Sequence, residues 1–196
     1  MPCEFQRDVL KLVRQVLGGS CEPTPKWLLR PGHVECGERW RLICEIYWEL
    51  TNQKLPQTMP RRESRRVDCV LKAANSNPRI IEVDETQHFN RFRAETLRLY
   101  PPEIELAFDR KVWAERSEAK KKLEGGGFTM TTSPLFPGDE GRHRQRAFRD
   151  ALCDILPSVH GFLPTLRIAK FDVNDWLKVY DARDKMEELL RTKFSN

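Results

Sequence analysis

The sequence predicts an α/β protein in which a mixed central sheet is flanked by helices. Two short, mainly apolar runs, 67–71 and 80–84, are separated by a turn-rich stretch, a pattern typical of adjacent buried strands. Apolar residues at helical spacing lie before and after these strands. With 196 residues, the chain can bury one sizeable core but is too short for two independent ones, so we expect a single domain.

Two helices are predicted before the strands. Residues 5–17 carry apolar side chains at helical spacing and end at a pair of glycines, an ordinary helix terminus. Residues 20–37 are rich in proline, and we expect a linker there rather than an element. The second helix runs from Glu38 to about Thr51, with apolar residues on one side and three glutamates along the border: Glu38, Glu45 and Glu49.

Three further elements are predicted after the strands. Residues 90–140 contain one helix at about 111–123 and are otherwise irregular, so we expect an insertion over the mouth of the site. Residues 147–156 then predict a helix that packs on the sheet with its arginines on the opposite side. A strand at 163–171 and a closing helix from 173 to about 193 complete the chain.

Acidic residues stand inside the two predicted strands, where a buried carboxylate costs several kcal/mol unless it is paired or holds a metal. Asp68 lies in the first run, and Glu82 and Asp84 lie in the second. Since successive strand residues point to opposite faces, Glu82 and Asp84 share one face, which Asp68 can reach from the neighbouring strand. Clustered carboxylates select Mg²⁺ or Mn²⁺, so the sequence predicts a divalent metal site.

The residues at the end of the second strand and directly after it allow two interpretations each. Asp84 and Gln87 have the spacing of a capping box, and Asp84 could start a helix instead of serving the site. His88 could exchange protons with water or phosphate, because a histidine titrates near neutral pH. It could equally be a partly buried histidine packed beside the site.

The stretch from Asp68 to His88 resembles the active-site motif of the PD-(D/E)XK, restriction-endonuclease-like nucleases, and looks most similar to the very-short-patch-repair endonuclease branch. Asp68 matches the first metal-binding aspartate and Glu82 the second acid, while the end of the motif is matched by Asp84, Gln87 and His88. Two positions depart from the pattern: Glu85 replaces a glycine of that branch, and Asp84 replaces the lysine of the superfamily. The resemblance covers residues 38–90 and, more weakly, 141–176.

This resemblance implies a restriction-endonuclease-like three-layer core. Residues 1–37 would be an N-terminal helical extension and 38–90 the core with the motif. Residues 91–140 would be an insertion after the third core strand, and 141–196 would complete the core.

The implied activity is hydrolysis of DNA phosphodiester bonds by a Mg²⁺- or Mn²⁺-dependent endonuclease. The implied catalytic residues are Asp68, Glu82, Asp84, Gln87 and His88. The implied metal ligands are Asp68, Glu82, the backbone carbonyl of Val83, and a glutamate of the first core helix. Glu38 fits that glutamate best, with Glu45 and Glu49 as alternatives, although each is equally well explained as a solvated helix residue. Because the lysine is missing, Gln87, His88 or an arginine of 142–149 would have to replace it.

Local clusters of basic residues favour a nucleic-acid partner. The net charge of +5, from 34 basic and 29 acidic residues, permits a polyanion without requiring one. Phosphate-binding candidates flank the first acidic strand and the later helix: Arg61, Arg62, Arg65, Arg66, Arg142, Arg144 and Arg146. A further run is Lys120, Lys121 and Lys122. We expect DNA, with RNA as the alternative, and a homodimer or a larger defence or repair complex as alternatives to a monomer.

A rival interpretation keeps the fold but not the reaction, as a catalytically inactive module that binds nucleic acid or protein. Other catalytic classes find no support, since the sequence lacks a phosphate-binding glycine loop and a nucleophile elbow. The six cysteines lack zinc-site spacing, and we expect Cys44, Cys69 and Cys153 to be free thiols in apolar surroundings. With neither a signal peptide nor a membrane-length apolar run, we expect a cytoplasmic protein without a membrane partner.

Overall fold

The computed structural model describes residues 4–119 and 133–195. Its core is a four-stranded sheet in the order β1-β2-β3-β4. The strands are β1 (Ser20–Glu22), β2 (Cys69–Lys72), β3 (Arg79–Asp84) and β4 (Leu163–Ala169). β1, β2 and β3 pair antiparallel, and β4 pairs parallel with β3. The predicted mixed sheet is therefore confirmed.

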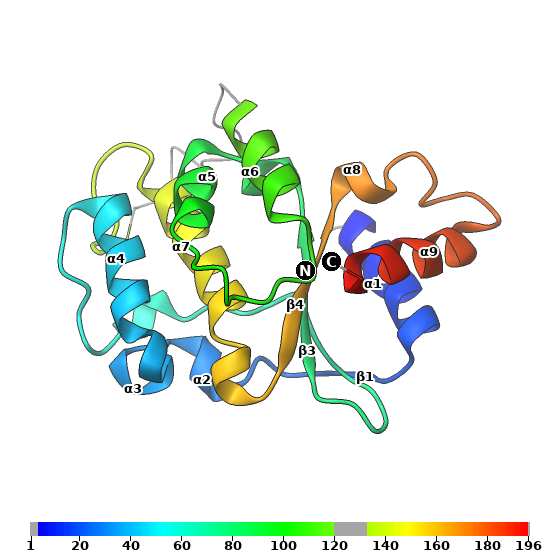
Figure 1. The fold of residues 1–196 in the computed structure, drawn as a ribbon, viewed down its shortest axis with the longest axis horizontal. Helices are drawn as coiled ribbons and strands as arrows, with labels where there is room; N and C mark the ends of the chain where they lie inside the picture. Colours follow the sequence, from blue (N-terminus) through cyan, green and yellow to red (C-terminus); the bar gives the residue numbers. More distant parts are fainter. Residues whose placement is uncertain (1–3, 120–132, 196) are drawn as a thin grey trace.

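Helices cover both faces of this sheet, so the molecule has three layers (Figure 1). One face carries α1 (Glu4–Leu17) and α9 (Ala182–Phe194), which pack on each other. The other face carries α4 (Trp40–Thr51), α5 (Arg91–Arg98) and α7 (Gly141–Ile155), with α6 (Arg110–Ala119) packed on α5. The predicted α/β class with flanking helices is confirmed.

The alternation of strand side chains divides the core into two clusters. Ile81 and Val83 of β3 pack with Val9 and Met186 from the α1 and α9 layer. Ile80 of the same strand packs with the helices of the other layer. Because Glu82 alternates with Ile81 and Val83, its side chain faces α7.

The segment predicted as a linker contains three short elements, and that prediction is wrong. Residues 20–37 include β1, α2 (Lys26–Leu29) and α3 (His33–Cys36). β1 has only three residues, all exposed, so it lacks the apolar alternation by which a strand is recognised. The approach of β1 to β2 requires Gly19, which has φ +90°, because a Cβ there would lie 2.4 Å from the carbonyl oxygen of Lys72.

Several helix boundaries differ from those expected. The helix expected to begin at Glu38 begins at Trp40, after the 3₁₀ turn η1 (Gly37–Arg39). The strand expected to run to Phe171 ends at Ala169 and is followed by the short helix α8 (Lys170–Val173). The closing helix expected from residue 173 begins only at Ala182, as α9. Further 3₁₀ turns are η2 (Arg61–Glu63), η3 (Thr86–His88) and η4 (Ser158–His160).

The described part of the segment 90–140 belongs to the helical layer. α5 packs against α4, α6 and α7, and Phe92 and Leu97 lie in the core. None of the described residues of this segment lines the cavity reported below. Residues 120–132, which include the three-lysine run, lie outside the described residues.

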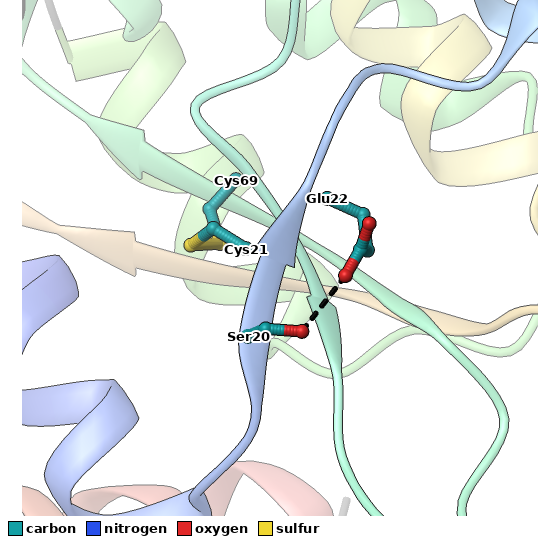
Figure 2. Close-up of a disulfide and its surroundings, with 4 residues drawn as sticks. All are labelled: Ser20, Cys21, Glu22 and Cys69. Atoms are coloured by element: carbon teal, nitrogen blue, oxygen red, sulfur yellow. Dashed lines mark hydrogen bonds between the residues drawn. A yellow bond between two sulfur atoms is a disulfide. The ribbon is translucent and has the colours of Figure 1, made fainter.

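A disulfide joins Cys21 of β1 to Cys69 of β2, with 5.6 Å between their Cα atoms (Figure 2). The prediction that Cys69 is a free thiol is therefore wrong, whereas Cys44 and Cys153 are free as expected. Sequence spacing alone could not reveal this pairing, because the two cysteines are 48 positions apart. Within the described ranges, none of the helices is long and apolar enough to cross a membrane.

Candidate active site

A cavity of about 480 Å³ opens between the ends of β2 and β3 and the helix α7. Nine residues predicted for the site line it: Arg65, Arg66, Asp68, Glu82, Val83, Gln87, His88, Arg142 and Arg146. Arg149, one of the arginines of 142–149 considered for the missing lysine, lines it as well. Five residues that were not predicted complete the lining: Gln6, Ser64, Glu85, Gln145 and Asp150. The cavity therefore gathers residues from α1, the β2–β3 pair and α7 into one site.

Asp68 and Glu82 lie across from each other at this cavity. Cys69 pairs with Ile81 in the β2–β3 ladder, and the same register continued by one residue puts Asp68 opposite Glu82. Asp68 Oδ2 accepts a hydrogen bond of 2.8 Å from the backbone N–H of Val83, so its carboxylate extends the ladder past the end of β2. Burial raises the pKa of Asp68, although the bond from Val83 opposes the rise.

Glu82 is buried and already has a cationic partner. Its Oε1 accepts from Arg65 Nη2 at 2.9 Å and lies 3.5 Å from Cys153 Sγ. Burial raises the pKa of Glu82 to about 7 even though Arg65 lowers it. Near neutral pH the carboxyl group is therefore divided between its protonated and ionised forms, and an additional cation would favour the ionised form.

Asp84 neither caps a helix nor lines the cavity, which corrects both interpretations of this residue. Its Oδ1 lies 2.8 Å from Arg167 Nη1, and its Oδ2 accepts from Trp113 Nε1 at 3.0 Å. The following helix α5 is capped by Asn90, whose side chain accepts from the backbone N–H of Arg93 at 3.2 Å. Asp84 thus satisfies its buried charge with Arg167, a residue 83 positions away in the sequence.

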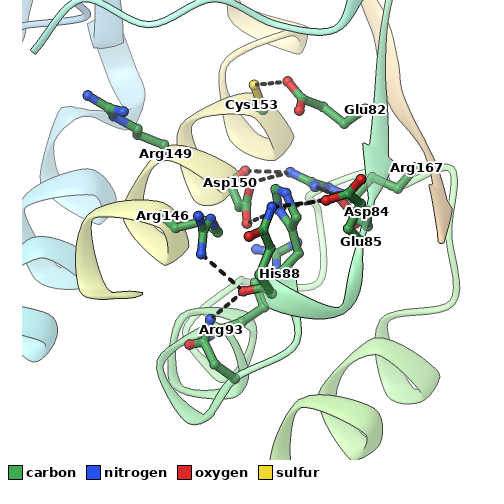
Figure 3. Close-up of polar contacts among 12 residues, drawn as sticks. Glu82, Asp84, Glu85, His88, Arg93, Arg146, Arg149, Asp150, Cys153 and Arg167 are labelled. Atoms are coloured by element: carbon green, nitrogen blue, oxygen red, sulfur yellow. Dashed lines mark hydrogen bonds and ion pairs between the residues drawn. The ribbon is translucent and has the colours of Figure 1, made fainter. Parts of the chain in front are cut away.

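His88 is held by an aspartate that the sequence did not single out. Its Nδ1 lies 3.1 Å from Asp150 Oδ2 of α7 and 3.5 Å from Asp84 Oδ1 (Figure 3). Burial disfavours the charged ring, but Asp150 and Asp84 outweigh burial and raise the pKa of His88. With Nδ1 facing Asp150, the ring nitrogen Nε2 is the atom that could exchange a proton in the cavity.

Arg167 contacts three aspartates, of which Asp150 lines the cavity and Asp84 and Asp154 do not. It lies 2.8 Å from Asp84, 3.4 Å from Asp150 and 2.7 Å from Asp154, and its side chain has no exposed surface. Asp154 also accepts from Arg93 at 2.5 Å and from the Tyr100 hydroxyl at 2.8 Å. One signal for this network was present in the sequence, since Asp150 and Asp154 fall four positions apart on one helix face and are interleaved with the apolar residues of that helix.

The glutamate expected from the first core helix does not reach the cavity. Glu38 is 76% exposed and lies 3.8 Å from Arg39, because the 3₁₀ turn directs it away from the sheet. Glu45 is exposed and pairs with Arg41, and Glu49 is exposed as well. The assignment of Glu38 as a metal ligand is therefore wrong, and so are its two alternatives.

We expected the arginines of α7 to point away from the sheet, but three of them line the cavity instead. Arg142, Arg146 and Arg149 lie on successive turns and line the cavity. Burial and the neighbouring Arg65 lower the pKa of Arg149, and burial and Arg142 lower that of Arg146, so positive charge is crowded here. Arg144 instead donates to the carbonyls of Pro137 and Asp139 at 2.7 Å.

Two other predicted phosphate ligands lie before Arg65 in the chain, at positions 61 and 62. Arg61 is exposed and does not line the cavity, whereas its neighbours Arg65 and Arg66 do. The side chain of Arg62 lies outside the described part of the chain.

The residues present fit a divalent cation only in part. Asp68 and Glu82 offer two carboxylates at a polar cavity, which suits Mg²⁺ because this ion keeps waters and takes one or two carboxylates plus substrate phosphate. Among the described residues, however, no group of three or more His, Cys, Asp or Glu side chains is arranged to hold a metal ion. Any cation here would therefore depend on water and substrate oxygens for most of its shell.

Comparisons with protein-family models, curated proteins and solved structures find no match for this chain. The resemblance to the nuclease superfamily therefore rests on the residues of the motif themselves.

Proposed function

We propose that this protein is a Mg²⁺- or Mn²⁺-dependent endonuclease that hydrolyses DNA phosphodiester bonds on a restriction-endonuclease-like fold. The observation that supports this proposal most strongly is the meeting of Asp68 and Glu82 at one cavity lined by arginines. Carboxylates that bind a divalent cation and guanidinium groups that bind phosphate are the two parts that such a hydrolysis needs.

In this proposal each group of residues has one task. Arg66, Arg142 and Arg146 hold the nucleic-acid backbone, with Arg149 added to the predicted set. Asp68, Glu82 and the Val83 carbonyl would hold the cation, which would acidify a bound water and polarise the scissile phosphate. Glu82 must first release Arg65 Nη2, which can then approach the phosphate while Arg65 Nη1 donates to the backbone carbonyl of Arg149.

His88 takes the place of the missing lysine in this account. Asp150 orients the ring through Nδ1, so that Nε2 can accept a proton from the attacking water or donate one to the leaving oxygen. Asp84 cannot take this place, since Arg167 neutralises it behind the cavity.

A second candidate function is a nucleic-acid-binding module without catalysis. It is favoured by the ion pair between Arg65 and Glu82, because a buried carboxylate that already has a cationic partner needs no metal. In this alternative the arginines bind phosphate as before, and Glu82 serves only to fix Arg65. RNA is the alternative partner in both cases, because contacts from arginine to phosphate do not depend on the sugar.

Nicking of supercoiled plasmid by purified protein tests the proposal. We expect cleavage with Mg²⁺, none with EDTA, and loss of cleavage in Asp68→Ala and Glu82→Ala. Glu38→Ala is the matched control, because this acid is exposed away from the cavity and its loss should leave the rate unchanged. DNA binding by all four proteins, without Mg²⁺-dependent nicking by any of them, would favour the binding module instead.

A further inference from the structure

Asp68 is fastened on both sides by one short segment of the chain. The residue after it, Cys69, forms the disulfide with Cys21. The residue before it, Val67, donates its backbone N–H to Thr24 Oγ1 at 3.1 Å. The segment 20–24 therefore holds the backbone of Asp68 at two points, one covalent and one polar (Figure 2 shows the disulfide).

The position of Asp68 has few other supports. β2 begins only at Cys69, so Asp68 lies just outside the regular strand and meets β3 through its side-chain bond to Val83. β1, in turn, pairs with β2 through three residues, and all three are exposed. Short exposed pairings of this kind open more easily than the core of a sheet.

We propose that Cys21 and Thr24 are positioning residues for Asp68, and that the Cys21–Cys69 disulfide makes this positioning sensitive to thiol reductants. Two external thiols would supply two electrons and two protons, leaving Cys21 and Cys69 as thiols and the reductant as a disulfide. Cys21 belongs to an exposed strand, so a reductant can reach the bond from that side. The segment 20–24 then loses its covalent hold, and the Asp68 carboxylate loosens from Val83.

The consequence for catalysis rests on the proposed function, but the loosening does not. In a reducing compartment Cys21 and Cys69 would be thiols, and Asp68 would be less firmly positioned at the cavity. A disulfide oxidant would re-form the Cys21–Cys69 bond and restore the position of Asp68. The redox state of Cys69 would in this way control how firmly the neighbouring Asp68 is positioned.

Hydrogen exchange of the Val83 amide, measured by NMR without metal, tests the positioning directly. Reduction by dithiothreitol should speed this exchange about 10-fold or more through a local opening that does not depend on denaturant, while exchange of the Ile80 and Ile81 amides inside β3 should follow only the loss of global stability. Cys21→Ser should exchange quickly with or without reductant, and Thr24→Val should be intermediate. Equal Val83 exchange in the oxidised and reduced protein, or unfolding of the whole sheet on reduction, would overturn the proposal.

Calorimetric titration with Mg²⁺ connects this inference to the site. Reduction should weaken the affinity of the wild type, but leave that of Cys21→Ser unchanged. Equal affinities in the two redox states of the wild type would overturn the link to the cation. If neither state binds Mg²⁺ while Val83 exchange still responds to reduction, the positioning stands and the proposed nuclease function fails.

Discussion

Arg65 Nη2 lies 2.9 Å from Glu82 Oε1, and both side chains are more than nine-tenths buried. The two proposed functions differ in the role of this ion pair. In the nuclease a divalent cation replaces Arg65 at Glu82, whereas in the binding module the ion pair is retained. It also explains why Glu82 can be buried at all, since the guanidinium offsets part of the desolvation of the carboxylate.

Replacing Glu82 with glutamine should change how stability depends on pH. Burial raises the pKa of Glu82 to about 7 in the folded protein, against an ordinary value of 4.5, so the folded protein keeps this proton to higher pH than the unfolded chain. The wild type therefore loses stability as pH rises from 4.5 to about 7. Glutamine does not titrate, so the free energy of unfolding of Glu82→Gln should not fall in this way. As pH rises between these limits, it should increase relative to that of wild type by up to about 3 kcal/mol.

Urea unfolding at several pH values checks this expectation. Glu45→Gln is the matched control, since that carboxylate is 54% exposed and its loss should leave the pH profile parallel to wild type. A Glu82→Gln profile that also runs parallel to wild type would show that Glu82 is not protonated in the folded state.

Removing Arg167 should destabilise the protein severely. Arg167→Met leaves Asp84, Asp150 and Asp154 without their shared cation in the interior, which should cost about 3–5 kcal/mol. Arg98→Met, which breaks an exposed pair with Glu118, should cost less than about 1 kcal/mol. Similar losses in the two variants, measured by urea unfolding, would contradict the central role given to Arg167.

If the protein cleaves DNA, His88 and Asp150 should appear in its pH–rate profile. His88→Asn should lower the rate about 100-fold or more without changing DNA affinity. Because Asp150 raises the pKa of His88, Asp150→Asn should move the limb of the profile that reports His88 to lower pH. A profile for Asp150→Asn that coincides with wild type would remove Asp150 from the account.

Reduction of the disulfide should also lower global stability. Closing a loop across a separation of 48 positions stabilises the folded state by about 4 kcal/mol in the chain-entropy model. The free energy of unfolding should therefore fall on reduction of the wild type. The same reductant should leave Cys21→Ser unchanged, and a comparable fall in that variant would assign the effect to another cause.

The strands and the main helices could be predicted from the sequence because their apolar periodicity is strong. Half of the residues of β3 are β-branched, and the helices α1 and α7 show clear apolar faces. β1 could not be predicted in this way, since three exposed residues show no periodicity and depend on pairing with β2.

Site residues could be predicted only where the local sequence pattern determines their positions. Asp68, Glu82 and His88 follow from the strand pattern and the motif, and they meet at the cavity as expected. Partners from distant parts of the chain could not be paired in advance, as with Arg167 for Asp84 and Asp150 for His88. Glu38 was misplaced because a 3₁₀ turn, which the sequence does not signal, directs it outward.

The most direct test of the central claim is an NMR titration with Mn²⁺, whose unpaired electrons broaden signals from nearby nuclei. If Asp68 and Glu82 hold the cation, the Val83 and His88 amides of the wild type should broaden at low Mn²⁺ concentration. The same amides should stay sharp in Asp68→Ala, while Glu38→Ala should behave like wild type. Unbroadened Val83 and His88 signals in the wild type at saturating Mn²⁺, with DNA present, would contradict a metal site between Asp68 and Glu82.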